Sequence, residues 1–207
     1  MENLQLYLAS RSPRRRILIE QLGLAYGTLD VDIDEQPLEA EGPSEYVARL
    51  AAEKALKGWQ QVDQGKIPVL GADTCIVFDG RIIGKVDRRE DSVALLKQFS
   101  GTRHEVLTGI AMVGRDFESG SAVKKRIQVN SSSITFRELT DEECEQYWDT
   151  GEPLGKAGGY AIQGIAAAFI KKIEGSYSGV MGLPLCELSE LLSDFGIKWL
   201  PKHKNNK

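Results

Sequence analysis

Hydrophobic and polar positions alternate at the start of the chain and then change to a helical period. Leucines at positions 4, 6 and 8 alternate with other side chains, which is the two-residue period of a strand. The next apolar positions share one helical face and end before Gly23, a residue that commonly closes a helix. Ser12 suits the N-cap and Pro13 the first helical position. The pattern therefore predicts a strand, a short loop and the beginning of a helix.

The same patterns predict the elements of the remaining chain. Apolar positions spaced by three and four predict helices over residues 43–61, 87–100, 140–150 and 184–195. Strands are expected over residues 28–33, 68–78, 81–83, 104–113, 122–138 and 166–173, with Asp79-Gly80 as a two-residue hairpin turn. Strands that alternate with helices and hairpins predict an α/β protein with a mixed, twisted sheet flanked by helices. We expect a single domain over residues 1–200 and a polar tail over residues 201–207.

Composition and charge exclude several classes of protein. The formal net charge of −4 argues against a general nucleic-acid binder, because such proteins usually carry a basic face. No apolar run approaches the roughly 20 residues that a membrane span needs. The cysteines are far apart, without metal or redox spacing, and no signal peptide precedes the first strand. We therefore expect a cytoplasmic protein with reduced cysteines and neither nucleic-acid nor membrane partners.

A cluster of arginines occupies the first turn of the predicted first helix. Arg14, Arg15 and Arg16 lie at the positive end of the helix dipole, which costs roughly 0.3–1 kcal/mol for each cation. A bound anion would offset this cost, and backbone N–H groups, arginines and the hydroxyl of Ser10 together suit a phosphate. The alternative is a solvated basic turn.

Asp73 interrupts the nearly continuous apolar run of residues 68–78. A carboxylate in a strand buried on both faces must be paired, bound to metal or carry a raised pKa. The neighbouring Thr74 and Gly71 leave room for a ligand, which favours function over a structural aspartate that caps a loop. The hairpin after this strand brings Lys85 back towards Asp73, either as a salt bridge or as a phosphate clamp.

Three further segments contain candidate ligands. Lys54 lies on the apolar face of the helix over residues 43–61, where an ammonium needs a partner unless its stem carries it to water. The acidic group that ends at Glu35 could bind a divalent cation or form a solvated turn. The glycine-rich residues 151–164 allow close approach of a ligand, with Lys156 for phosphate and Gln163 for hydrogen bonds to a base or phosphate. The P-loop pattern is absent, so glycine richness alone is weak evidence.

Four short motifs, taken together, resemble the Maf family of nucleoside triphosphate pyrophosphatases. They are residues 8–15 (LASRSPRR), 70–74 (LGADT), 156–164 (KAGGYAIQG) and 182–185 (GLPL). The resemblance implies an elongated, two-lobed Maf/ITPase-like fold with a central cleft, commonly as a homodimer. It also implies hydrolysis of the α–β phosphoanhydride of a nucleoside triphosphate to a monophosphate and diphosphate, with a divalent cation such as Mg²⁺ or Mn²⁺.

The resemblance assigns roles to individual residues. The form of the motifs is similar to the dTTP/UTP branch, with Arg14, Thr74 and Gln163 discriminating between substrates. The implied phosphate ligands are Ser10, Arg14 and Arg15, together with Lys54 and Lys85. Asp73 is the expected general base or metal ligand, and Glu35 is the second carboxylate for metal or water. This assignment predicts one catalytic and metal-binding centre at Asp73 and Glu35.

Several alternatives stay open at this point. The chain could be a 7-methyl-GTP pyrophosphatase, or a non-catalytic, nucleotide-responsive regulator of cell division, a role also associated with the family. House-cleaning of modified pyrimidine nucleotides is a further role that the resemblance allows. An RNA-binding module is disfavoured, because the chain has neither a repeated basic tract nor an aromatic stacking motif.

Overall fold

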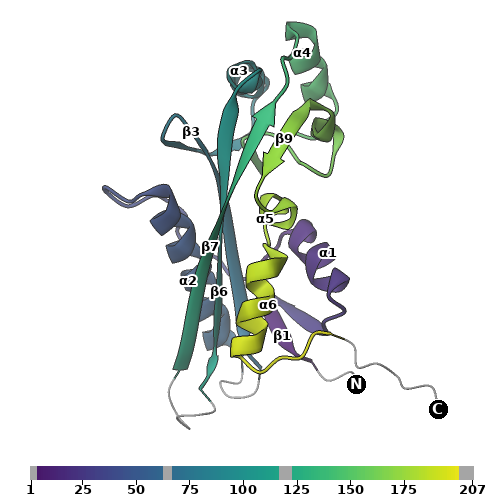
Figure 1. Cartoon of the computed structure of the whole chain (residues 1–207). Coiled ribbons are helices and arrows are strands. Elements are labelled where there is room, and N and C mark those ends of the chain that lie inside the picture. Colours follow the sequence, from purple (N-terminus) through teal and green to yellow (C-terminus); the bar gives the residue numbers. More distant parts are fainter. Residues whose placement is uncertain (1–3, 63–66, 117–122, 201–207) are drawn as a thin grey trace, which may run out of the picture.

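A computed structural model describes residues 4–62, 67–116 and 123–200. The molecule is elongated, and the long strands of its sheet run along its length (Figure 1). The predicted tail over residues 201–207 lies outside the described residues. Within the described ranges, no helix is both long and apolar enough to cross a membrane.

One mixed sheet forms the centre of the described structure. Its main path has the order β2-β1-β3-β6-β7-β9, and β4 pairs with the free edge of β3. Strands β1 and β2 run parallel to β3, whereas the other neighbours are antiparallel. The strands are β1 (Leu6–Ala9), β2 (Tyr26–Leu29), β3 (Val69–Phe78), β4 (Arg81–Ile83), β6 (Arg103–Arg115), β7 (Val123–Phe136) and β9 (Ile170–Glu174). A small second sheet pairs β5 (Lys85–Val86) with β8 (Lys156–Ala157).

Helices cover both faces of the main sheet, which confirms the predicted fold class. Helix α2 (Pro43–Gln61) lies on one face, and α1 (Pro13–Gln21), α5 (Tyr177–Met181) and α6 (Leu185–Asp194) lie on the other. The end of the molecule opposite the two chain termini contains further helices (Figure 1). They are α3 (Arg89–Phe99), α4 (Asp141–Asp149) and the 3₁₀ helix η1 (Ile165–Phe169).

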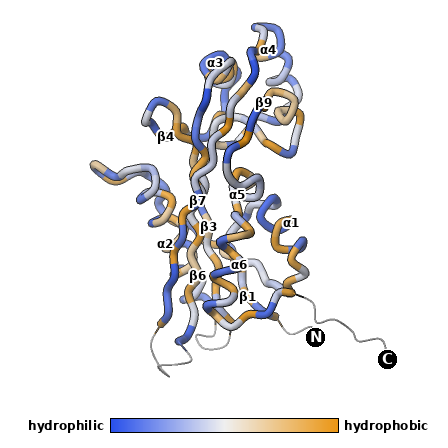
Figure 2. Tube along the Cα trace, viewed as in Figure 1, coloured by the Kyte–Doolittle hydropathy of each residue, from blue (hydrophilic) through white to orange (hydrophobic). Residues whose placement is uncertain are grey.

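The apolar side chains divide between the two ends of the molecule, as expected for two lobes. At one end, β1, β3 and β6 contribute to a core with α1 and α6, and a separate alanine-rich core lies under α2. At the other end, α3, α4 and η1 surround an aromatic core that includes Phe99, Phe136 and Tyr160. Hydrophobic and hydrophilic residues alternate along the helices and strands that surround these cores (Figure 2). Strand β3 contributes residues to every one of these cores and joins the two lobes.

Two glycines allow α2 to lie unusually close to the sheet. A Cβ atom on Gly71 would lie 2.2 Å from the carbonyl oxygen of Ala51, and one on Gly109 would lie 2.3 Å from that of Val47. Any larger residue would push the helix away from β3 and β6. The close packing sets the distance between Lys54 of α2 and Asp73 of β3.

Two of the predicted strands were wrong in their bounds. The strand expected over residues 28–33 is β2, which ends at Leu29, because its partner β1 ends at Ala9 and offers no backbone groups beyond it. The acidic residues that follow therefore lie in a loop. The strand expected over residues 166–173 begins as η1, because the Glu152 carboxylate accepts hydrogen bonds from the N–H groups of residues 165 and 166. That cap favours a helical turn over an extended segment.

Candidate active site

A cavity of about 770 Å³ lies where the parallel part of the sheet ends. Strand β1 pairs with β3 only as far as Gly71, and β4 begins to pair with β3 at Ile76. The edge of β3 between these two residues is open, and Asp73 and Thr74 lie in this open part. The cavity is therefore at the carboxyl end of β1, where ligands commonly bind in parallel α/β sheets.

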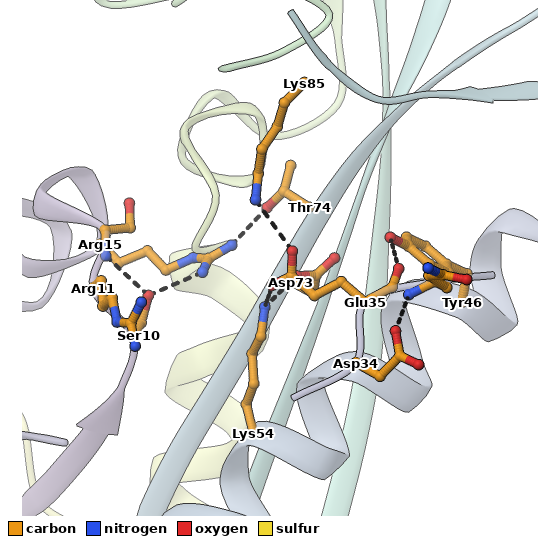
Figure 3. A network of polar contacts seen from close by, with 12 residues as sticks. Ser10, Arg11, Arg15, Asp34, Glu35, Tyr46, Lys54, Asp73, Thr74 and Lys85 are labelled. Carbon is orange, nitrogen blue, oxygen red and sulfur yellow. Dashed lines mark hydrogen bonds and ion pairs between the residues drawn. The ribbon is translucent and has the colours of Figure 1, made fainter. Parts of the chain in front are cut away.

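Charged residues from three segments meet on the α2 face of β3 (Figure 3). The Lys54 Nζ atom lies 2.6 Å from Asp73 Oδ1 and 2.7 Å from Glu35 Oε1. The Lys85 Nζ atom lies 3.1 Å from the other oxygen of Glu35. Lys54 is 9% exposed and Asp73 is 8% exposed. The buried ammonium of Lys54 therefore has a carboxylate partner, as a lysine on an apolar helical face requires. Lys85 reaches this network through Glu35.

The loop that carries Glu35 has no regular structure, but α2 holds it in place. The Tyr46 hydroxyl donates a hydrogen bond to the Glu35 carbonyl oxygen at 2.8 Å, and Arg49 bonds to the Gln36 carbonyl oxygen and to Glu41. Burial raises the pKa of Tyr46 to about 12, with a smaller contribution from the charges of nearby carboxylates, so the hydroxyl stays a donor. Burial raises the pKa of Glu35, but the ammonium groups of Lys54 and Lys85 outweigh it, and the pKa lies below its ordinary value.

The opposite face of β3 carries one guanidinium and several hydroxyl groups. Arg15 donates hydrogen bonds to the Gly182 carbonyl oxygen at 2.7 Å, to Ser10 Oγ at 3.0 Å and to Thr74 Oγ1 at 3.1 Å. Burial lowers the pKa of Arg15, and the negative charge of Asp73 partly offsets this effect. The guanidinium stays charged, as arginine does in proteins. Arg15 therefore ties the helix α1, the end of β1 and the open edge of β3 together.

Three further predicted site residues, Arg14, Gln163 and Lys156, lie at different positions relative to the cavity. Arg14 is half-buried in the cavity wall and makes no hydrogen bond or ion pair with any described residue; burial lowers its pKa. Gln163 lies at the exposed rim of the cavity. Lys156 is outside the cavity lining, and its ammonium donates to the Glu152 carbonyl oxygen. Thus Arg14 and Gln163 face the cavity, and the role of Lys156 stays a prediction.

The two predicted metal ligands lie together, although Lys54 lies between them. Among the described residues, no three His, Cys, Asp or Glu side chains are grouped to hold a metal ion. Magnesium commonly takes only one or two carboxylates and completes its shell with phosphate and water. Asp73 Oδ2 has no hydrogen-bond partner in the described structure and lies in the cavity wall. Asp73 with Glu35 therefore fits a divalent cation that arrives with a polyphosphate.

Sequence reasoning missed two residues that position this site. Tyr46 holds the Glu35 loop, and Thr108 of β6 lies 2.9 Å from Thr74 through their hydroxyl oxygens. Thr108 had a usable signal, because it interrupts the apolar strand over residues 104–113 as Asp73 interrupts its own strand. Tyr46 had none, since a tyrosine near the beginning of an amphipathic helix is an ordinary core residue.

Comparisons with known proteins concern the chain as a whole. A family model described as Maf-like protein matches residues 5–195. A relative from Alkalilimnicola ehrlichii is 46% identical over 198 residues, which cover 94% of each chain, and one from Hahella chejuensis is 47% identical with the same coverage. Both are named dTTP/UTP pyrophosphatase. The structure of the Staphylococcus aureus Ham1 protein aligns with 92% of this chain and 99% of that chain, at 14% identity and a TM-score of 0.48. The chain belongs to the family of Maf-like proteins.

Proposed function

We propose that this protein hydrolyses dTTP and UTP at the α–β phosphoanhydride, giving a nucleoside monophosphate and diphosphate. The names of the relatives at 46% and 47% identity support this reaction. The observation that carries the proposal is Asp73, a nearly buried carboxylate at the edge of the cavity, with one oxygen on Lys54 and the other without a partner among the described residues. Such a carboxylate suits the activation of a water molecule.

The charges around the cavity suit a triphosphate. A triphosphate carries about four negative charges near neutral pH, and its leaving diphosphate must be stabilised as the bond breaks. Arg14 has no protein partner in the described structure and is free to bind phosphate oxygens. Ser10 presents a hydroxyl beside it, and Lys85 extends from the other side of the cleft.

Each remaining residue has a distinct part in the proposed reaction. Asp73 Oδ2 activates the attacking water, either by accepting its proton or by holding a divalent cation, while Lys54 balances the charge of the carboxylate. Asp73 and Glu35 would hold a Mg²⁺ or Mn²⁺ ion, whose chemistry, when bound, is to lower the pKa of water and neutralise charge on phosphate. Tyr46 keeps the Glu35 loop against α2 and so maintains the distance between the carboxylates.

Product analysis with magnesium or manganese tests the proposal. We expect a monophosphate and diphosphate from dTTP and UTP, and much slower turnover of CTP, GTP and 7-methyl-GTP. Preferential turnover of 7-methyl-GTP would keep the reaction and overturn the choice of substrate. Binding of dTTP or UTP without turnover would support a regulatory protein. Homodimer formation, a cytoplasmic location and activity on modified pyrimidine nucleotides stay predictions.

A further inference from the structure

The hydroxyl groups on the Arg15 face of β3 form a chain in which the protons have fixed positions. Thr108 is fully buried, and its hydroxyl lies 2.8 Å from the Gly179 carbonyl oxygen. A carbonyl oxygen only accepts, so the single proton of Thr108 points to Gly179. Thr74 lies 2.9 Å from Thr108, and either hydroxyl could donate if the pair were isolated. Because the Thr108 proton is already used, Thr74 must donate to Thr108.

Thr74 is therefore left with acceptor capacity alone. A hydroxyl oxygen has one proton and two acceptor positions. The proton of Thr74 points to Thr108, and one acceptor position receives the Arg15 N–H at 3.1 Å. Thr74 is partly exposed and lines the cavity. A ligand that touches this hydroxyl meets an acceptor that cannot turn into a donor.

Ser10, on the same side of the cavity, has the opposite character. Its oxygen accepts the Ser12 backbone N–H at 3.2 Å and the Arg15 N–H at 3.0 Å. Its own proton is donated to none of the described residues. Ser10 thus offers a proton to a ligand, as an acceptor-only phosphate oxygen requires, whereas Thr74 would repel such an oxygen. The two hydroxyls therefore suit different parts of one ligand.

We propose that Thr108 is a positioning residue that fixes Thr74 as an acceptor, so that among pyrimidine bases the site selects those that carry a proton on N3. The inference rests on the proposed function. Uracil and thymine carry a proton on N3, whereas N3 of cytosine is an acceptor and would face the lone pair of Thr74. A site with a fixed polar group rejects the wrong partner strongly, because the group is left unpaired. A ribose hydroxyl at Thr74 would give no such discrimination, since UTP and CTP share it.

The substitution Thr108→Val tests the inference, because valine has nearly the same shape and no hydroxyl. Thr74 could then rotate and donate to N3 of cytosine. We expect the ratio of kcat/KM for UTP over CTP to fall about tenfold, mainly through improved CTP turnover. The Gly179 carbonyl oxygen keeps the backbone N–H of Gly182 as a donor at 2.9 Å, so the local fold should persist. Circular dichroism and thermal unfolding check this.

Two further variants separate orientation from packing. Thr108→Ser keeps the hydroxyl and should keep the wild-type ratio of UTP to CTP. Thr135→Val makes the same chemical change in the neighbouring strand β7 and should leave the ratio unchanged. An unchanged ratio in a folded Thr108→Val protein would overturn the inference alone, whereas a wild-type preference for CTP would overturn both the inference and the proposed choice of substrate. If the wild type hydrolyses no nucleotide, the proposed function fails, and calorimetric affinities for UTP and CTP in the same variants test the inference instead.

Discussion

Asp73 and Thr74 are adjacent in β3, yet they belong to two regions of different chemistry. On the Asp73 side, ammonium and carboxylate groups lie in direct contact, and Lys54 joins two carboxylates. On the Thr74 side, a guanidinium and hydroxyl groups form hydrogen bonds in which the protons of Thr74 and Thr108 have defined acceptors. Neighbouring residues of a strand point to opposite faces of the sheet. A single open strand edge can therefore present both regions to one cavity.

The two regions differ in what a substitution should change. In the charged region, neighbouring charges compensate one another, and removal of one leaves another buried and unpaired. In the hydroxyl region, removal of one group mainly frees a proton to change direction. We therefore expect the largest losses of rate and stability from the buried groups of the first region, and changes of KM and selectivity from the second. The following predictions test this contrast, beginning with the largest effect.

Asp73→Asn should give the largest loss of activity. The amide has nearly the shape of the carboxylate but does not accept a proton from water, and general-base catalysis contributes about 10²–10⁴-fold. We expect kcat to fall by about 10³-fold with an intact fold, measured as diphosphate release from UTP. Asp79→Asn is the matched control, because Asp79 makes the exposed hairpin turn after the same strand. Near-normal turnover in folded Asp73→Asn would refute the proposed role.

Lys54→Met should give the largest loss of stability. The substitution leaves Asp73 and Glu35 facing each other without the ammonium that now lies between them. Removal of one partner from a buried pair costs about 3 kcal/mol of unfolding free energy. Urea denaturation at neutral pH measures this loss. Lys57→Met is the control, because Lys57 is exposed and, within the part of the chain that the structure describes, bonds only to a loop carbonyl oxygen. Equal stability of the two variants would contradict the contrast between the regions.

Much of the fold follows from the sequence because period and turn chemistry are local properties. The helix over residues 43–61 and the hairpin at Asp79-Gly80 have the predicted bounds. The end of β2 could not be predicted from its own sequence, because it is set by the length of β1, which lies elsewhere in the chain. The 3₁₀ turn after Gly164 did not follow either, since its cap comes from Glu152, a residue thirteen positions earlier.

The candidate site could be predicted where a charged residue interrupts an apolar pattern. Lys54 lies on an apolar helical face and Asp73 in an apolar strand, so each was expected to have a partner. In the structure the two form an ion pair with each other. Glu35 and Gln163 lie in loops without a periodic pattern. Local sequence made both of them candidates, and only the family resemblance gave each a definite role. The directions of the hydroxyl protons could not be predicted, because they depend on the Gly179 carbonyl oxygen meeting Thr108 from a distant segment.

Arg15→Lys should have an intermediate effect on the hydroxyl region. Lysine keeps the positive charge, but its single ammonium does not reach the three acceptors that the planar guanidinium binds. We expect KM for UTP to rise about tenfold and the unfolding free energy to fall by about 1–2 kcal/mol, with a smaller change in kcat. Steady-state kinetics and thermal unfolding measure both. Arg16→Lys, one position along α1, is the control, and a similar rise of KM there would remove the special role of Arg15.

Glu35→Gln should have the smallest effect on stability, visible as a change in the acid dependence of unfolding. The pKa of Glu35 lies below its ordinary value of 4.5, so ionised Glu35 stabilises the folded state. This stabilisation is complete above the ordinary value and is lost as the pH falls through the lower folded value. Because the side chain is 40% exposed, solvent screening limits the difference to less than about 1 kcal/mol. Urea denaturation of the wild type and Glu35→Gln at about pH 6 and about pH 3.5 should give curves that converge at the lower pH.

Glu39→Gln, in the same loop and without a hydrogen bond or ion pair to any described residue, is the control. If the unfolding free energies of the wild type and Glu35→Gln still differ at the lower pH, the difference comes from packing and not from the charge of Glu35. The charged region would then resemble the hydroxyl region more than the structure indicates.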